Sequence, residues 1–236
     1  MRPVQKKSVG EKLGEFTILA EYKPYQTAKQ ILVANLGEYC SYCERPVGEE
    51  DIEVEHVEPK SLVSDKEFSW DNFLLSCKRC NGRDNKGNKP VALMETHFPH
   101  KDNTLLSICY TTGGMVKISP NIPINSHEYQ KAKALIDLVG LDKRPGHPQF
   151  LAKDKRWSKR REVWELATRY LEDFESENIK VQVITDLALS RGFFSVWFTV
   201  FNAHKAVKKA LIQAFAGTAD CFDPHCTPIP RPTNDF

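Results

Sequence analysis

The amino-acid sequence predicts an α+β protein, in which a small cysteine-bound β-hairpin is followed by a mainly α-helical region. Three observations predict this class. Two C-x-x-C motifs stand at 40–43 and 77–80. Residues 51–56 between them alternate apolar and charged residues, whereas apolar residues beyond about residue 120 recur at helical spacing. We therefore expect two domains, 1–115 and 116–236.

The elements before residue 90 follow from local patterns. Residues 23–39 are predicted to form a helix that Gly37 ends. Residues 51–56 alternate with period two and predict a short strand, for which 73–75 is the expected partner. The polar and basic run 78–87 indicates a short surface helix or turn.

Three helices are expected in the second region. Residues 126–140 have a capping serine at one end and a glycine at the other. Residues 148–177 place Trp157 and Trp164 seven apart, which predicts an apolar stripe on a long helix. Residues 193–215 repeat this pattern, and the proline-rich tail that follows is expected to be extended.

Aromatic residues crowd the start of the last predicted helix. They cover more than one helical face, so two interpretations stay open: a wholly buried helix, or a partly exposed surface that docks a partner. The residues are Phe193, Phe194, Trp197, Phe198 and Phe201.

Composition and targeting signals exclude little. The 236 residues carry a net charge of +2, so only local clusters of charge can argue for a nucleic-acid partner. The uncharged stretch 192–204 is shorter than the roughly 20 residues that cross a bilayer. No apolar signal segment follows the N-terminal residues, so we expect a cytoplasmic protein without a membrane span.

The two C-x-x-C motifs indicate a structural metal site. In a reducing compartment, paired cysteines are better interpreted as metal ligands than as disulfides, and no βαβ context supports a redox motif. Four thiolates supply a closed tetrahedral Zn²⁺ site that has no open position for catalysis. The predicted ligands are Cys40, Cys43, Cys77 and Cys80.

Polar residues between and beside these motifs form a constellation. Glu55 precedes His56, Asn72 follows 16 residues later, and Asn81 directly follows the last cysteine. Each alone is better interpreted as a surface or turn residue, but together they rarely arise by chance. From Cys40 to about residue 86 the chain resembles the HNH endonucleases of the ββα-metal class, in the variety held by two C-x-x-C motifs.

The resemblance implies a role for each residue. Glu55 and Asn81 would bind a divalent metal, His56 would activate water, and Asn72 would orient the loop that follows His56. Glutamate stands where the family often has aspartate, which lengthens that ligand arm by one methylene. The implied cofactors are structural Zn²⁺ and a catalytic divalent cation such as Mg²⁺.

These residue types suit phosphodiester hydrolysis. The reaction needs a nucleophilic water and a cation that neutralises charge on the phosphate and the leaving oxygen. A neutral imidazole takes a proton from water near pH 7, and a hard cation prefers carboxylate and amide oxygens.

Two basic segments are candidate phosphate contacts, although a solvated surface is the alternative for each cation. The first segment contains Lys60, Lys78, Arg79, Arg83 and Lys86. The second sets six cations against Asp154 within residues 153–161 and contains Lys155, Arg156, Lys159, Arg160 and Arg161.

Phrases spread over nearly the whole chain, at 1–4, 38–46, 99–104 and 215–223, resemble the PtuB nucleases of Septu-type and retron-associated anti-phage systems. That resemblance implies an ABC-class, PtuA-like ATPase as partner, and in retron systems a reverse transcriptase with its RNA–DNA. The function expected is DNA cleavage by an HNH endonuclease in anti-phage defence. An RNA-cleaving (tRNA) effector and a catalytically silent zinc-ribbon adaptor remain the alternatives.

Overall fold

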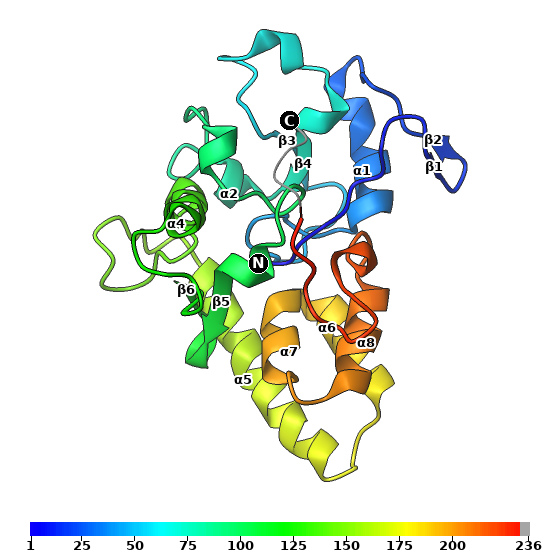
Figure 1. The fold of residues 1–236 in the computed structure, drawn as a ribbon, viewed down its shortest axis with the longest axis vertical. Helices are drawn as coiled ribbons and strands as arrows, with labels where there is room; N and C mark the ends of the chain where they lie inside the picture. Colours follow the sequence, from blue (N-terminus) through cyan, green and yellow to red (C-terminus); the bar gives the residue numbers. More distant parts are fainter. Residues whose placement is uncertain (232–236) are drawn as a thin grey trace.

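A computed structural model describes residues 1–231, which form eight α-helices and three separate two-stranded antiparallel sheets. Figure 1 shows helices α5 to α8 gathered at one end and the β3–β4 hairpin with α1 at the other. The strands are β1 (Lys12–Leu13), β2 (Phe16–Thr17), β3 (Glu53–His56), β4 (Phe73–Ser76), β5 (Ile108–Thr111) and β6 (Met115–Ile118). The helices are α1 (Lys29–Leu36), α2 (Lys78–Asn81), α3 (Thr104–Ser107), α4 (His127–Val139), α5 (Arg156–Glu175), α6 (Val181–Arg191), α7 (Phe194–Val200) and α8 (Lys205–Ala214).

The predicted hairpin is confirmed. Strand β3 pairs antiparallel with β4, which places His56 opposite Phe73 and Glu53 opposite Ser76. All four residues of β4 are buried, and α1 packs against this strand. The expected helix over 23–39 is shorter than predicted, because a 3₁₀ turn at Tyr25–Ala28 precedes α1.

Helix α4 matches its prediction to within one residue. The Ser126 hydroxyl accepts a hydrogen bond from the Tyr129 amide, which caps the first turn. Gly140 ends the helix in the left-handed conformation at φ 57°, which costs a residue without Cβ very little.

The helix predicted over 148–177 forms as α5, and its apolar stripe is confirmed only in part, because Trp164 packs against the core but arginines share the buried face. The tryptophans at 157 and 164 are only half-buried, and the buried face carries Arg156, Arg160, Val163 and Ala167. Two arginines can occupy this face because backbone carbonyls and a carboxylate accept most of their N–H groups. A pattern that counts only apolar residues does not reveal this pairing.

The single helix predicted over 193–215 is two helices, α7 and α8, and α6 before them was not predicted. The aromatic residues of this segment are all buried: Phe193, Phe194, Trp197, Phe198 and Phe201 are at most 7% exposed. The interpretation as an exposed docking surface is therefore wrong, because these rings belong to the core.

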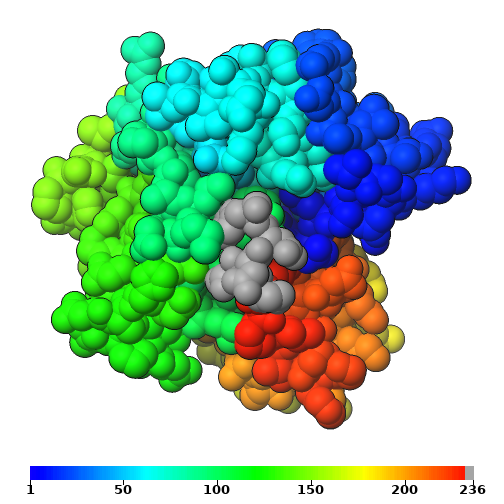
Figure 2. Space-filling model, turned by 45° about the horizontal axis from the view of Figure 1, so that its top comes forward, coloured from blue at the N-terminus to red at the C-terminus, as the bar shows by residue number. Residues whose placement is uncertain are grey.

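The two halves of the chain share one core, which runs from Met1 to Cys226. The Arg2 guanidinium donates to the carbonyls of Leu36 and Ala216, so the N-terminal segment lies beside the C-terminal one. Figure 2 shows the blue N-terminal segment next to the orange and red segment on one face. Hairpin β5–β6 lies across the predicted boundary at 115/116. None of the helices within residues 1–231 is long and apolar enough to cross a membrane.

Candidate functional site

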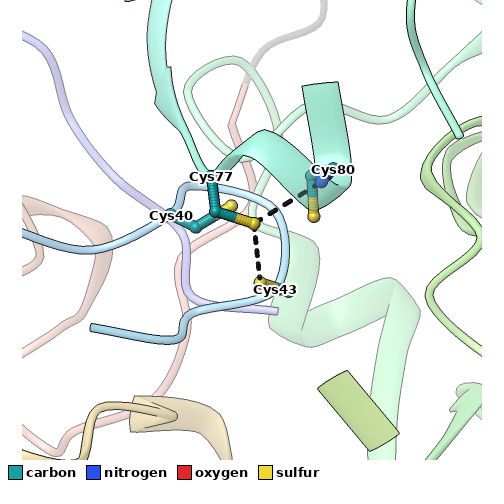
Figure 3. A group of neighbouring side chains, drawn as sticks. All are labelled: Cys40, Cys43, Cys77 and Cys80. Carbon is teal, nitrogen blue, oxygen red and sulfur yellow. Dashed lines mark hydrogen bonds between the residues drawn. The ribbon is translucent and has the colours of Figure 1, made fainter. Parts of the chain in front are cut away.

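The four predicted zinc ligands meet at one buried point (Figure 3). Their sulfur atoms all lie within 4.8 Å of one another, and the Sγ atoms of Cys43 and Cys77 are 3.8 Å apart. Tetrahedral Zn²⁺ with bonds of about 2.3 Å holds its sulfurs about 3.8 Å apart. The site therefore fits a structural zinc ion, and burial leaves no open side for a substrate.

Arg156 packs onto this metal site from helix α5. Its Nη1 donates to Cys80 Sγ at 3.1 Å and to the Val139 carbonyl at 2.8 Å, and its Nη2 pairs with Asp154 at 2.7 Å. Burial disfavours the charged guanidinium, but the neighbouring thiolates and the Asp154 carboxylate outweigh burial and raise the pKa of Arg156. Arg156 thus compensates negative charge at the thiolates. The prediction that it contacts nucleic acid is not supported, because the side chain is buried.

His56 ends strand β3 and is held on three sides. Its Nε2 lies 2.9 Å from the Glu67 carbonyl, and because a carbonyl only accepts, Nε2 carries the proton. Nδ1 is then the nitrogen with a free lone pair. Tyr25 and Phe73 contact the imidazole edge-on, with ring centroids 4.7 Å and 5.2 Å away. Burial lowers the pKa of His56, which favours the neutral form that accepts a proton.

Asn72 fastens the loop that follows His56. Its Oδ1 accepts the Glu58 amide at 2.8 Å, and its Nδ2 donates to the carbonyls of Glu58 at 3.0 Å and Lys66 at 3.2 Å. The side chain is buried, so these bonds cross the loop from within. This is the geometry that the role implied for Asn72 requires.

Glu55 belongs to strand β3, and its side chain is buried near the zinc site. Lys86 Nζ is 2.6 Å from its Oε1 and donates to the His56 carbonyl at 2.7 Å, and the Tyr42 hydroxyl is 3.4 Å from the same Oε1. Burial raises the pKa of Glu55 to about 7, although Lys86 opposes this shift. The interpretation of Lys86 as a phosphate contact is wrong, since the side chain is 1% exposed and neutralises Glu55.

Asn81 contacts a residue that the sequence interpretation missed. Its Nδ2 donates to Glu53 Oε2 at 2.9 Å, and it has no direct hydrogen bond to Glu55 among the described residues. Side chains at i and i+2 of a strand share a face, so Glu53 and Glu55 point to the same side of β3. Glu53 thus lies on the Glu55 face of β3 and contacts Asn81, and the alternation of this strand could have identified it.

The remaining predicted phosphate contacts lie at the surface, where most have acidic partners. These pairs are Lys60 with Glu67, Lys78 with Asp51, Arg79 with Asp84, Lys159 with Glu162 and Arg161 with Glu165. Arg83 and Lys155 are exposed. Arg160 is buried and donates to the carbonyls of Gly114 and Leu141, so the prediction of a nucleic-acid contact there is not supported.

Comparison with known proteins supports the interpretation of this segment. Residues 40–87 match the HNH endonuclease family. Over 63 residues the chain is 43% identical to a Septu protein PtuB of Bacillus thuringiensis. That similarity covers 26% of this chain and 24% of the relative, so the chain matches about a quarter of the relative's length. The matched family segment contains the four cysteines and all four of the residues in the predicted constellation.

Proposed function

We propose that the chain, which carries an HNH endonuclease domain at residues 40–87, hydrolyses phosphodiester bonds of DNA as the effector of an anti-phage defence complex. The observation that supports this proposal best is the state of His56. Its imidazole has a fixed tautomer and a lowered pKa, and it lies within the matched segment. A zinc-ribbon adaptor would need none of these properties.

In this proposal His56 acts as the general base. Nδ1 takes a proton from the water that attacks the phosphorus, while Nε2 keeps its own proton and donates a hydrogen bond to the Glu67 carbonyl, which fixes the ring. That hydrogen bond also stabilises the imidazolium as it forms. Asn72 keeps the loop between residues 57 and 67 in the position where Glu67 can accept this bond.

Glu55 and Asn81 would hold the divalent cation, with Glu53 beside them. The two carboxylates on one face of β3 and the Asn81 amide of α2, which contacts Glu53, are the residue types that a hard cation such as Mg²⁺ prefers. When bound, this cation would neutralise charge on the phosphate and on the leaving oxygen. Lys86 Nζ neutralises Glu55 in this structure, so binding of the cation by Glu55 would replace this ion pair.

The partners belong to the proposal. The similar relative is a Septu protein, which supports a place in a defence system. The wider sequence resemblance adds an ABC-class, PtuA-like ATPase beside the nuclease. Cleavage of RNA, such as tRNA, within a retron system is the second candidate, because a site that contacts the phosphate backbone does not select the sugar.

The test is cleavage of labelled double-stranded DNA, single-stranded DNA and tRNA with Mg²⁺, with and without the neighbouring ATPase. We expect the wild-type protein to cut DNA and His56→Ala to be inactive, with zinc content and circular dichroism unchanged. Full turnover by His56→Ala would contradict the proposed base. Cleavage of tRNA alone would establish the RNA alternative, and cleavage of nothing would favour the adaptor.

A further inference from the structure

A groove of about 600 Å³ runs along helix α5, where the helical half meets the first C-x-x-C motif. Arg45 and Pro46, which follow this motif, line one side. Side chains of α5 line the other side, and the end of α6 contributes Arg191. Pro46, Val163 and Leu166 give the groove an apolar surface. None of the lining residues belongs to β3 or to the loop after His56, so this groove is separate from the candidate active site.

The charges of the groove are unbalanced. Its two carboxylates are already neutralised, Glu162 by Lys159 at 2.8 Å and Glu165 by Arg161 at 2.7 Å. Four further lining cations are exposed and have no acidic partner within residues 1–231; they are Arg45, Lys155, Arg169 and Arg191. The groove therefore presents a net positive charge that no described part of the chain compensates.

The spacing of these cations indicates the shape of the ligand. Lys155 directly precedes α5 and stands 14 residues before Arg169, which separates the two by about 21 Å along the helix axis at 1.5 Å per residue. A small anion cannot reach both ends, whereas an extended polyanion with regularly spaced charges can. Arg45 and Arg191 lie on other segments and would contact the same polyanion from the sides.

We propose that this groove binds a single-stranded segment of nucleic acid outside the candidate active site. The inference rests on the proposed nuclease function, because an HNH domain brings a polyanion of this kind to the protein. A single strand offers unpaired bases and sugars to the apolar surface while its phosphates contact the cations. A duplex keeps its bases paired inside and leaves that surface unused. An acidic protein segment is the competing ligand.

The experiment measures binding without cleavage, in a His56→Ala background. A fluorescein-labelled 20-nucleotide DNA strand and the matching duplex are titrated by fluorescence anisotropy over a series of salt concentrations. Arg169→Gln/Arg191→Gln removes two groove cations. Lys205→Gln/Lys209→Gln is the matched control, because it removes two exposed cations of the same helical half that do not line the groove.

We expect the groove variant to bind the single strand about tenfold more weakly, and the dependence of log affinity on log salt to fall by about 1.4, at about 0.7 per lost phosphate contact. The control should bind like its parent, and the duplex should be affected less than the strand. Equal affinities and salt slopes for the two variants would overturn the proposal. So would polyglutamate binding in the groove when the strand does not bind.

These outcomes are separate from the test of the candidate active site. If His56→Ala loses cleavage but still binds the labelled strand, the result bears on the proposed general base and not on the groove. Equal binding by the groove variant and its control would reject the groove and leave the nuclease proposal intact.

Discussion

At the scale of single residues, the environment of His56 depends on a side chain outside the HNH match. Tyr25 lies in the 3₁₀ turn before α1, and its ring packs 4.7 Å from the imidazole. Lys60 Nζ lies 4.6 Å from the Tyr25 ring centroid and 2.9 Å from the Glu67 carboxylate, and the Glu67 carbonyl accepts the hydrogen bond from His56. Tyr25, Lys60 and Glu67 thus contact one another or the imidazole, so we expect Tyr25 to position His56.

We expect Tyr25→Ala to lower kcat roughly 10- to 100-fold, because a displaced general base loses its alignment with the attacking water. Tyr25→Phe is the matched variant, since it keeps the ring that packs on the imidazole, and it should cut at close to the wild-type rate. The measurement is single-turnover cleavage with unchanged circular dichroism. Equal rates for Tyr25→Ala and wild type would show that the ring does not position His56.

The pH dependence of cleavage follows from the burial of the His56 imidazole. A base must be neutral to accept a proton, and burial lowers the pKa of His56 from its ordinary 6.5. Lys60 and Lys86 also lower this pKa, whereas Glu67 raises it. Activity should therefore persist below pH 6.5 and fall only as the pH drops through the lowered value. The prediction would be contradicted if kcat/KM began to fall, as the pH is lowered, while the pH is still above 6.5.

The Lys86–Glu55 pair gives a prediction for stability. Removing one partner leaves a buried charge without compensation, which costs about 3 kcal/mol or more. Lys86→Met should therefore lower the free energy of unfolding in urea by about that amount at pH 8. Glu55→Gln/Lys86→Met should recover much of the loss, because no unpaired charge remains. A single variant as stable as the wild type would show that the pair contributes little.

At the scale of elements, the sequence predicts those helices and strands whose bounds depend on nearby residues. Helix α4 carries its own caps in Ser126 and Gly140, so its bounds follow from neighbouring residues. The orientation of α5 depends on carbonyls of other segments that pair with Arg156 and Arg160, and these partners are remote in sequence. The four cysteines were predictable because metal ligation leaves a fixed spacing, whereas the Tyr25 contact leaves none.

Arg156 links helix α5 to the zinc site and supplies the next prediction. Residues that hydrogen-bond to metal ligands typically change metal affinity about 10- to 100-fold when they are replaced. Arg156→Met should therefore release zinc to a chromophoric chelator more readily and lower the Tm. Arg161→Met is the control, because this arginine pairs at the surface with Glu165. Equal zinc affinities for the two variants would show that Arg156 does not stabilise the thiolates.

At the scale of the whole molecule, all four zinc ligands belong to the first half of the chain, and the second half packs against their site. Glu44, which follows Cys43, is buried, and its carboxylate accepts the Tyr110 hydroxyl at 2.7 Å and the Ser195 amide at 2.8 Å. The Phe193 amide donates to the Glu44 carbonyl at 2.8 Å. Each C-x-x-C motif thus contacts a helix of the other half. Glu44, beside the first motif, binds α7, and Cys80 of the second motif accepts a hydrogen bond from Arg156 of α5.

This arrangement leads us to expect one cooperative unfolding transition for the full chain, although the sequence predicts a division at 115/116. In calorimetry, the calorimetric and van't Hoff enthalpies should agree. Removal of zinc should lower the Tm of the whole transition, because metal binding contributes to folding and both halves contact the site. Glu44→Leu should lower this same Tm without splitting the transition. Two transitions, one of them insensitive to zinc removal, would instead show that 116–236 folds as an independent domain.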